Sequence, residues 1–316
     1  MDMMMRSTEE TAAKEEEAMA AADEVCACCG TAAVDDVTLK KCACGLVKYC
    51  SDDCHENNRP QHEEECKKRS SELRGDDLFN QPDESHLGEC PICCLPLPID
   101  VGSVFMGCCS KMICKGCNIA NMKREIEAGL ERRCAFCREP VAKSQEEGEK
   151  NMMERIKKND PAALWHMGQN RYHQGDYETA LDYWTKAAEL GHADAHYEVS
   201  VAYRKWQGVE KDMKKEVYHA EEAAMKGNPW ARNNLGCLEW NNGRFDRARK
   251  HFIIAANLGH EKSLKALRQL YAEGHASKED YANALRAYQA AVDATKSAER
   301  EEAETYYIAR DTDRPN

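Results

Sequence analysis

Cysteine is the residue type with the clearest chemical potential in this chain of 316 residues. Seventeen of its eighteen cysteines fall between Cys26 and Cys137, and only Cys237 lies outside that stretch. The first 24 residues are acidic and lack the basic start and apolar run of a secretion signal. Clustered cysteines in a reducing compartment indicate bound metal, with disulfides as the general alternative. We therefore expect a zinc-binding protein.

The first cluster contains eight ligand-type residues in four close pairs: Cys26 and Cys29, Cys42 and Cys44, Cys50 and Cys54, and His62 and Cys66. Four pairs match two tetrahedral zinc sites, because structural zinc takes four sulfur or nitrogen ligands. His62 and Cys66 are four residues apart, so on a helix they share a face, and Pro60 suits the start of that helix. Cys28 is expected to be a spare thiol. His55 is the alternative to His62.

The segment Tyr49 to Cys54, together with His62 and Cys66, resembles a MYND finger. The resemblance implies interleaved pairs, in which Cys26, Cys29, Cys50 and Cys54 hold one zinc and Cys42, Cys44, His62 and Cys66 hold the other. Only Ala43 separates the second pair, where two residues are usual. His55 and Arg59 stand where relatives carry a Gln and a Trp that dock proline-rich peptides. A peptide or another subunit is the expected ligand of this finger, and its class stays open.

The second cluster is made of four further pairs: Cys90 and Cys93, Cys108 and Cys109, Cys114 and Cys117, and Cys134 and Cys137. Cys-Pro-Ile-Cys at its start and Cys-Ala-Phe-Cys-Arg at its end resemble a RING finger over about residues 88–140. The resemblance implies a cross-brace in which Cys90, Cys93, Cys114 and Cys117 share one zinc and Cys108, Cys109, Cys134 and Cys137 share the other. Lys111 occupies the usual histidine position, so Cys108 is expected to complete the second site. A site with three ligands is the alternative, and Cys94 is expected to be a non-ligand.

The expected ligands divide evenly among the ions. Without Cys28, Cys94 and Cys237, fifteen cysteines remain, and His62 brings the set to sixteen, or four ligands for each of four zinc ions. Closed sites of this kind are structural, because no coordination position stays open for water or substrate. Small modules with little apolar core are expected to unfold without their metal. An iron–sulfur protein fits the paired cysteines less well.

RING fingers commonly act as ubiquitin ligases by docking a ubiquitin-conjugating enzyme, with no nucleophile of their own. The resemblance assigns contact with that enzyme to Ile92 and Pro140, and contact with ubiquitin to Arg138. The alternative is that Ile92 only packs and Arg138 is only solvated. Ala135 stands where the last knuckle usually has a proline.

Helices are predicted both within the second cysteine cluster and throughout the C-terminal part of the chain. An amphipathic helix that forms finger core is predicted after Cys117 by Ile119, Met122, Ile126 and Leu130. In the C-terminal part, alanine pairs begin at residues 187, 223, 255 and 290, spaced by 36, 32 and 35 residues. Apolar periodicity predicts helices over 162–172 and 177–188, with a turn at Gly175. Glycines that suit helix C-termini follow three of the alanine pairs, at Gly191, Gly227 and Gly259.

These units resemble tetratricopeptide-type repeats, and more closely the Sel-one-like subclass, over about residues 160–295. The stretch Gly208 to Asp212 carries the subclass signature, and Gly168 and Gly175 are matched at the same separation by Gly236 and Gly243. The resemblance implies stacked helix pairs with a concave protein-binding surface. An ordinary helical bundle is the alternative.

The predicted fold is therefore two small zinc-stabilised cross-brace fingers followed by an all-α helical-repeat solenoid. The expected parts are a disordered acidic tail (1–24), a MYND-type finger (25–67), a linker (68–87), a RING-type finger (88–141), a second linker (142–159), the repeats (160–295) and a polar C-terminal tail (296–316). The order of the three modules resembles that of a group of proteins from diatoms and related algae.

Charge and hydropathy exclude several other classes. A net charge of −12 argues against a nucleic-acid partner, and no apolar run approaches the ~18 residues that span a membrane. No phosphate-binding loop or nucleophile elbow is present. The expected function is a protein-interaction protein of the cytoplasm or nucleus, a RING-type ubiquitin ligase whose repeats select the substrate. The competing hypothesis is a non-catalytic scaffold or adaptor.

Overall fold

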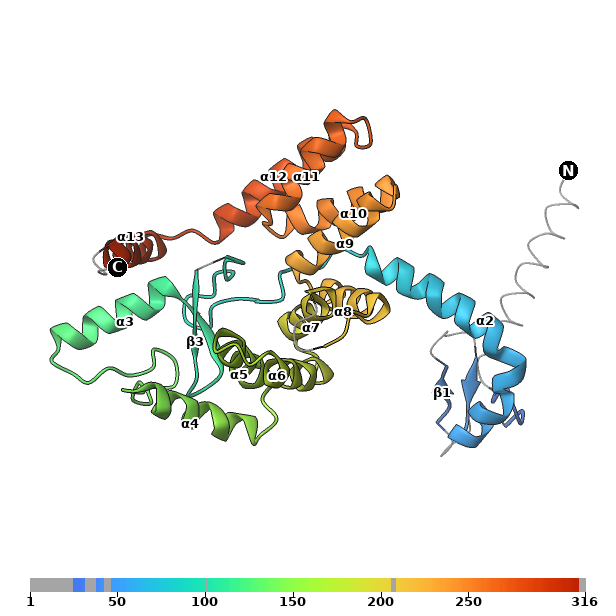
Figure 1. Ribbon diagram of the computed structural model, residues 1–316, viewed down its shortest axis with the longest axis horizontal. Coiled ribbons are helices and arrows are strands. Elements are labelled where there is room, and N and C mark those ends of the chain that lie inside the picture. Colours follow the sequence, from blue (N-terminus) through green and yellow to red (C-terminus); the bar gives the residue numbers. More distant parts are fainter. Residues whose placement is uncertain (1–24, 32–37, 43–46, 101, 206–208, 313–316) are drawn as a thin grey trace, which may run out of the picture. The chain divides into compact units, whose positions relative to one another are not determined.

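The computed structural model describes residues 25–31, 38–42, 47–100, 102–205 and 209–312. The predicted acidic tail, Cys44 and Gly208 lie outside the described residues. The chain forms two compact units, residues 1–78 and residues 79–316 (Figure 1). None of the described helices is both long and apolar enough to cross a bilayer.

The described residues of the first unit form a two-stranded hairpin followed by a long helix. Strands β1 (Lys40–Lys41) and β2 (Lys48–Tyr49) pair antiparallel. Helix α2 (Asp52–Leu78) begins with two aspartates, whose negative charges suit the positive end of the helix dipole. Pro60 lies inside this helix, so the expectation that it marks the helix start is wrong. The helix also continues through residues 68–78, which the sequence pattern assigns to a linker.

The second unit begins with the second cysteine cluster. Strands β3 (Ser103–Met106) and β4 (Lys111–Cys114) pair antiparallel, and helix α3 (Lys115–Glu127) follows β4 directly. The sulfur of Cys114 accepts from the amide of Cys117 and so caps the start of α3. On this helix Ile119 and Met122 are buried, as predicted. Ile126 and Leu130 are each 64% exposed, which differs from the expected finger core: α3 ends at Glu127 and has only one covered side.

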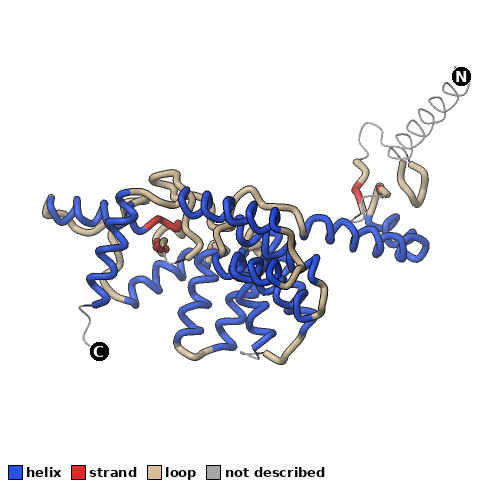
Figure 2. Tube along the Cα trace, turned by 90° about the horizontal axis from the view of Figure 1, so that it is seen from above, coloured by secondary structure: helices blue, strands red, loops and turns tan. Residues whose placement is uncertain are grey.

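The rest of the second unit is helical: α4 (Gln145–Ile156), α5 (Pro161–His173), α6 (Tyr177–Glu189), α7 (Ala193–Lys205), α8 (Met213–Met225), α9 (Pro229–Asn241), α10 (Phe245–Asn257), α11 (Glu261–Ala272), α12 (Lys278–Ala294) and α13 (Ala298–Thr312). From α5 to α12 each helix packs against the next in sequence, so that hairpins stack in a row (Figure 2). Gly191, Gly227 and Gly259 have φ angles of +86°, +85° and +90°, which confirms their predicted place at helix ends. The chain thus combines cysteine-rich modules with an all-α stack of helical repeats, and the predicted fold class is confirmed.

Two glycines allow aromatic rings to lie between paired helices. A Cβ on Gly168 of α5 would lie 2.5 Å from the indole of Trp184 on α6. A Cβ on Gly236 of α9 would lie 2.6 Å from the ring of Phe252 on α10. Both rings are buried. The matched glycines of the sequence therefore reflect the same packing in the first and third hairpins.

Two segments assigned to a linker and a polar tail form helices. Helix α4 lies within residues 142–159 and is capped by Ser144, whose hydroxyl accepts from the amide of Glu147. Helix α13 lies within residues 296–316 and covers one face of α3. The buried cluster between α3 and α13 contains Ile119, Met122 and Ala303, and the partly buried Tyr306 and Tyr307 pack against it. The apolar partner of α13 is distant in the sequence, so local periodicity could not reveal this contact.

Candidate metal centres

Cysteine and histidine side chains come together in four groups in the described part of the chain. The groups are Cys26, Cys29, Cys50 and Cys54; Cys42, His62 and Cys66; Cys90, Cys93, Cys114 and Cys117; and Cys108, Cys109, Cys134 and Cys137. Within each group the ligand atoms all lie within 4.8 Å of one another. Cys44, expected in the second group, lies outside the described residues. Each group could hold a metal ion, and zinc coordination by these residues stays a prediction.

The sulfur positions fit a tetrahedral ion. Zinc with Zn–S bonds of ~2.3 Å holds two of its sulfurs ~3.8 Å apart. The Sγ atoms of Cys29 and Cys50 are 3.5 Å apart, those of Cys93 and Cys114 are 3.8 Å apart, and those of Cys109 and Cys134 are 3.9 Å apart. Every described cysteine is free of disulfide bonds. Converging free thiols are the donor set that zinc prefers, so the groups fit this metal.

Three of the cysteine pairs form the same tight turn. The residue after the second cysteine is left-handed in each, with φ of +73° at Gly30, +56° at Cys94 and +65° at Arg138. The amides of these residues donate to the carbonyls of Cys26, Cys90 and Cys134 over 2.8, 2.9 and 3.0 Å. The turn brings the two sulfurs of a pair toward one point. Cys94 is exposed and outside all four groups, so its part in the structure is that of a turn residue.

Backbone amides favour the thiolate form at the first cysteine of two pairs. Burial raises the pKa of Cys26, but hydrogen bonds from the amides of Cys29, Cys50 and Cys28 outweigh it and lower the pKa to about 6. Burial also raises the pKa of Cys90, and amide donors including that of Cys114 lower it to about 7. At Cys108, burial and the neighbouring thiols raise the pKa. A cation is therefore needed to keep all four sulfurs of that group ionised.

The position of Cys108 supports one ligand assignment that the sequence left open. Cys108 joins the group of Cys109, Cys134 and Cys137, and its Sγ lies 3.4 Å from that of Cys137. Lys111 is exposed on β4. This grouping favours the all-cysteine set over a site with three ligands.

In the first unit, His62 is the histidine that groups with the cysteines. It is buried beside Cys42 and Cys66, whose Sγ atoms are 3.4 Å apart. His55 comes near, with its Nε2 3.9 Å from the Sγ of Cys42. Its ring instead packs edge-on against Tyr49, with the centroids 5.0 Å apart.

The side chains expected to dock a partner lie at the surface of the second finger. Ile92 is 41% exposed and Pro140 is also exposed. Phe136 is 43% exposed and holds the same place in the last cysteine pair that Ile92 holds in the first, so the equivalence of the two pairs in the sequence identifies it as a second surface candidate. Arg138 is exposed but bonded, because its guanidinium donates to the side-chain oxygen of Asn121 on α3 over 2.6 Å. Arg138 therefore lies against α3 and is not only solvated.

Arg300, near the start of α13, contacts the first site of this finger. Its guanidinium donates to the carbonyls of Pro96 and Leu95 over 2.7 and 3.1 Å, and to the Sγ of Cys93 over 3.4 Å. A cationic donor offsets part of the negative charge that four thiolates gather around one ion. Sequence reasoning missed this residue, because 207 positions separate Arg300 from Cys93.

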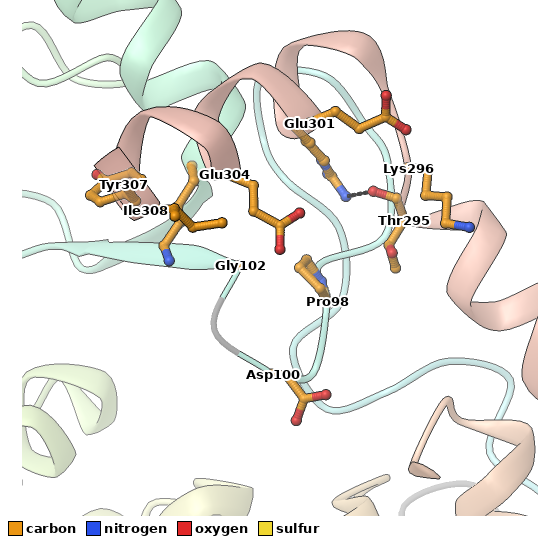
Figure 3. Close-up of a pocket in the computed structure, with 11 residues that line it drawn as sticks. Pro98, Asp100, Gly102, Thr295, Lys296, Glu301, Glu304, Tyr307 and Ile308 are labelled. Carbon is orange, nitrogen blue, oxygen red and sulfur yellow. Dashed lines mark hydrogen bonds between the residues drawn. The ribbon is translucent and has the colours of Figure 1, made fainter. Parts of the chain in front are cut away.

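A cavity of about 430 Å³ lies between α13 and the loop that precedes β3 (Figure 3). Pro98 and Asp100 line it from the loop, and Lys296, Glu301 and Glu304 line it from the C-terminal segment. The carboxylate of Glu304 points from α13 toward this space. The charges around it are of both signs, which is typical of a hydrated contact between two elements.

Arg300→Ala is expected to destabilise the second finger by about 1.5–3 kcal/mol, the usual cost of losing hydrogen bonds to a charged group. Zinc from the loaded protein should then pass faster to a colorimetric chelator, because Cys93 loses its cationic donor. The matched control is Arg286→Ala, because Arg286 is exposed and donates to Asn283 of its own helix. Equal rates of zinc transfer in both variants would contradict a supporting role for Arg300.

Comparison with protein-family models and with curated proteins gave no match. Among solved structures, the chain is similar to a Sel1 repeat protein from Oxalobacter formigenes, with 29% identity, a TM-score of 0.42, and coverage of 49% of this chain and 66% of that chain. It is also similar to c5321, a protective antigen of uropathogenic Escherichia coli strains that displays an SLR fold, with 20% identity, a TM-score of 0.41, and coverage of 47% and 34%. The match thus spans just under two thirds of the first protein and about one third of the second.

Proposed function

We propose that this is a zinc-stabilised interaction protein whose second finger docks a ubiquitin-conjugating enzyme. The observation that carries the proposal is the exposure of two large apolar side chains, Ile92 and Phe136, at equivalent places in the first and last cysteine pairs. Exposed apolar side chains on rigid turns suit a partner surface. The four-cysteine groups are closed, so the reactive centre would come from the partner.

Arg138 adds to this surface. It follows the last cysteine in a left-handed conformation, and its guanidinium bonds Asn121 on α3. The carboxylate of buried Glu125, also on α3, lies 3.6 Å from the same guanidinium. These two contacts hold an exposed cation at a defined place, where it could meet ubiquitin after exchanging the Asn121 bond.

The first finger would bind a peptide or another subunit. A cavity of about 370 Å³ in the first unit is lined by Tyr49, His55 and Arg59, among others. His55 and Arg59 are the positions that the MYND resemblance associates with peptide docking. The repeats would select the substrate, and we place the protein in the cytoplasm or nucleus.

Ile92→Ala is expected to reduce autoubiquitination more than tenfold, measured with purified activating and conjugating enzymes across a broad panel. The physical reason is the loss of an apolar anchor from the docking surface, since central anchors dominate binding energy. Leu285→Ala is the matched control, because Leu285 on α12 is 41% exposed, as Ile92 is. Leu285→Ala should behave as the wild type.

The competing proposal, a non-catalytic scaffold, rests on the bonds that already engage Arg138. It predicts no ubiquitin transfer with any enzyme of the panel, and no difference between wild type, Ile92→Ala and Arg138→Ala. Zinc content measured on the same preparations must be equal, so that loss of activity is not loss of fold.

A further inference from the structure

The segment 79–86, assigned to a linker by its polar sequence, lies on the surface of the repeats. It contacts α7, α9, α10 and the turn between α8 and α9, all within the second unit. A linker that only spans a distance makes few specific contacts. Residues 79–86, in contrast, make specific contacts at both ends of the segment and along its main chain.

Phe79 anchors one end of the segment on α10. Its ring packs against the imidazole of His251, with the centroids 4.8 Å apart. The guanidinium of Arg247 lies 4.9 Å from the ring centroid, and the ammonium of Lys250 lies 5.1 Å from it. Two cations over one aromatic ring form a receptor for an aromatic side chain.

The main chain and a polar side chain of the segment are also bound. Arg232 on α9 is fully buried, and its guanidinium donates to the carbonyl of Asn80 over 3.3 Å. The amide of Asn257 at the end of α10 donates to the side-chain oxygen of Gln81 over 3.0 Å. A buried guanidinium is costly to desolvate, so its bond to this carbonyl is a specific feature of the surface.

His86 anchors the other end. Its amide and its Nδ1 both donate to the carbonyl of Gly227, each over 3.3 Å. Its Nε2 lies 2.7 Å from a carboxylate oxygen of Asp194 at the start of α7, and its ring meets Trp230 edge-on at 5.7 Å. Both ring nitrogens thus face oxygen atoms that can accept a hydrogen bond.

The turn between α8 and α9 is shaped to admit this backbone. A Cβ on Gly227 would lie 3.0 Å from the carbonyl oxygen of Glu84 and 3.1 Å from the amide nitrogen of His86. Asp194 is held in place by the amide of Asn228, which donates to it over 2.9 Å. The aromatic receptor on α10, the main-chain donor on α9 and the carboxylate on α7 thus all contact the same eight-residue segment.

We infer that this surface is a peptide-binding groove that the chain fills with its own residues 79–86. The partner that fits it presents an extended segment with an aromatic side chain and, seven residues later, an imidazolium or another cation. This inference deepens the proposed selection of a substrate by the repeats and rests on it. The tethered segment has an effective concentration of about millimolar order, so a partner must exceed it in affinity to enter.

The test uses the full chain and a fluorescein-labelled peptide of residues 79–88, read by fluorescence anisotropy. The double variant Phe79→Ala/His86→Ala empties the groove in cis, and it should bind the peptide at least tenfold more tightly than the wild-type chain. A peptide carrying both substitutions is the matched control and should bind neither chain. Adding Lys250→Ala to the double variant should weaken peptide binding severalfold.

Two results would overturn the inference. One is equal or absent peptide binding in the wild type and the double variant, while circular dichroism shows that the variant keeps its helices. The other needs no variant: residues 79–86 of the wild type would exchange amide hydrogens as fast as the free peptide. Neither readout involves ubiquitin transfer, so failure here is distinct from failure of the docking proposed for Ile92.

Discussion

Removal of the metal is expected to unfold both cysteine-rich fingers and to leave the repeats helical. The described core of the first finger centres on Cys26, Cys42 and Tyr49. In the second finger, cysteines make up half of the fully packed core. Zinc contributes about 10–16 kcal/mol of apparent binding free energy in finger peptides, against the ~5–15 kcal/mol that holds a whole domain. Apolar burial in such small cores cannot replace it.

The measurement is hydrogen exchange with mass spectrometry before and after a strong zinc chelator, under reducing conditions. Peptides from the fingers should lose protection, and those from α5 to α12 should keep it. Metal analysis should find four zinc ions per chain in the wild type and three in Cys134→Ala, which removes a fully buried thiol. Cys28→Ala is the control, because Cys28 is exposed and outside the four groups.

Protection of the fingers that survives the chelator would contradict the metal assignment. So would mass spectrometry that finds these sulfurs bridged to one another. A count of three zinc ions in the wild type would point to the group that contains Cys108, where the sequence left a site with three ligands as the alternative.

Phe252→Ala is expected to lower the free energy of unfolding of the repeats by about 3–5 kcal/mol. The ring of Phe252 is fully buried between α9 and α10 and meets Trp240 edge-on at 5.9 Å. Its removal leaves a cavity that two rigid helices cannot close. Urea unfolding followed by circular dichroism at 222 nm measures the loss. Tyr218→Ala, which removes an aromatic ring that is 50% exposed, should change stability far less.

A double-mutant cycle tests the physical reason. Gly236→Ala alone should cost about 1–3 kcal/mol, because its new methyl group meets the ring of Phe252. In the Phe252→Ala background the same change should cost much less, because the ring is gone. Additive losses would show that the glycine and the ring are not coupled.

Much of the candidate site could be predicted because its determinants are local. A Cys-x2-Cys pair closes a turn by itself, and the left-handed residues Gly30, Cys94 and Arg138 follow directly in the sequence. The interleaving of the pairs came from family resemblance, and the positions of the described sulfurs agree with it. The exposure of side chains could not be predicted in the same way. Ile126 on α3 and Leu130, beyond the end of α3, fit the predicted helical period, yet each is 64% exposed.

The sequence by itself determined the cysteine pairs and the helical repeats, because each depends on residues only a few positions apart. The tertiary structure alone decided that Arg300 contacts Cys93, that α13 covers α3, and that residues 79–86 lie on the repeats. The segment 79–86 and helix α13 are polar and show no strong hydrophobic periodicity. Their partners lie as far as 207 positions away, so only the folded chain brings together the charges and apolar faces that hold them in place.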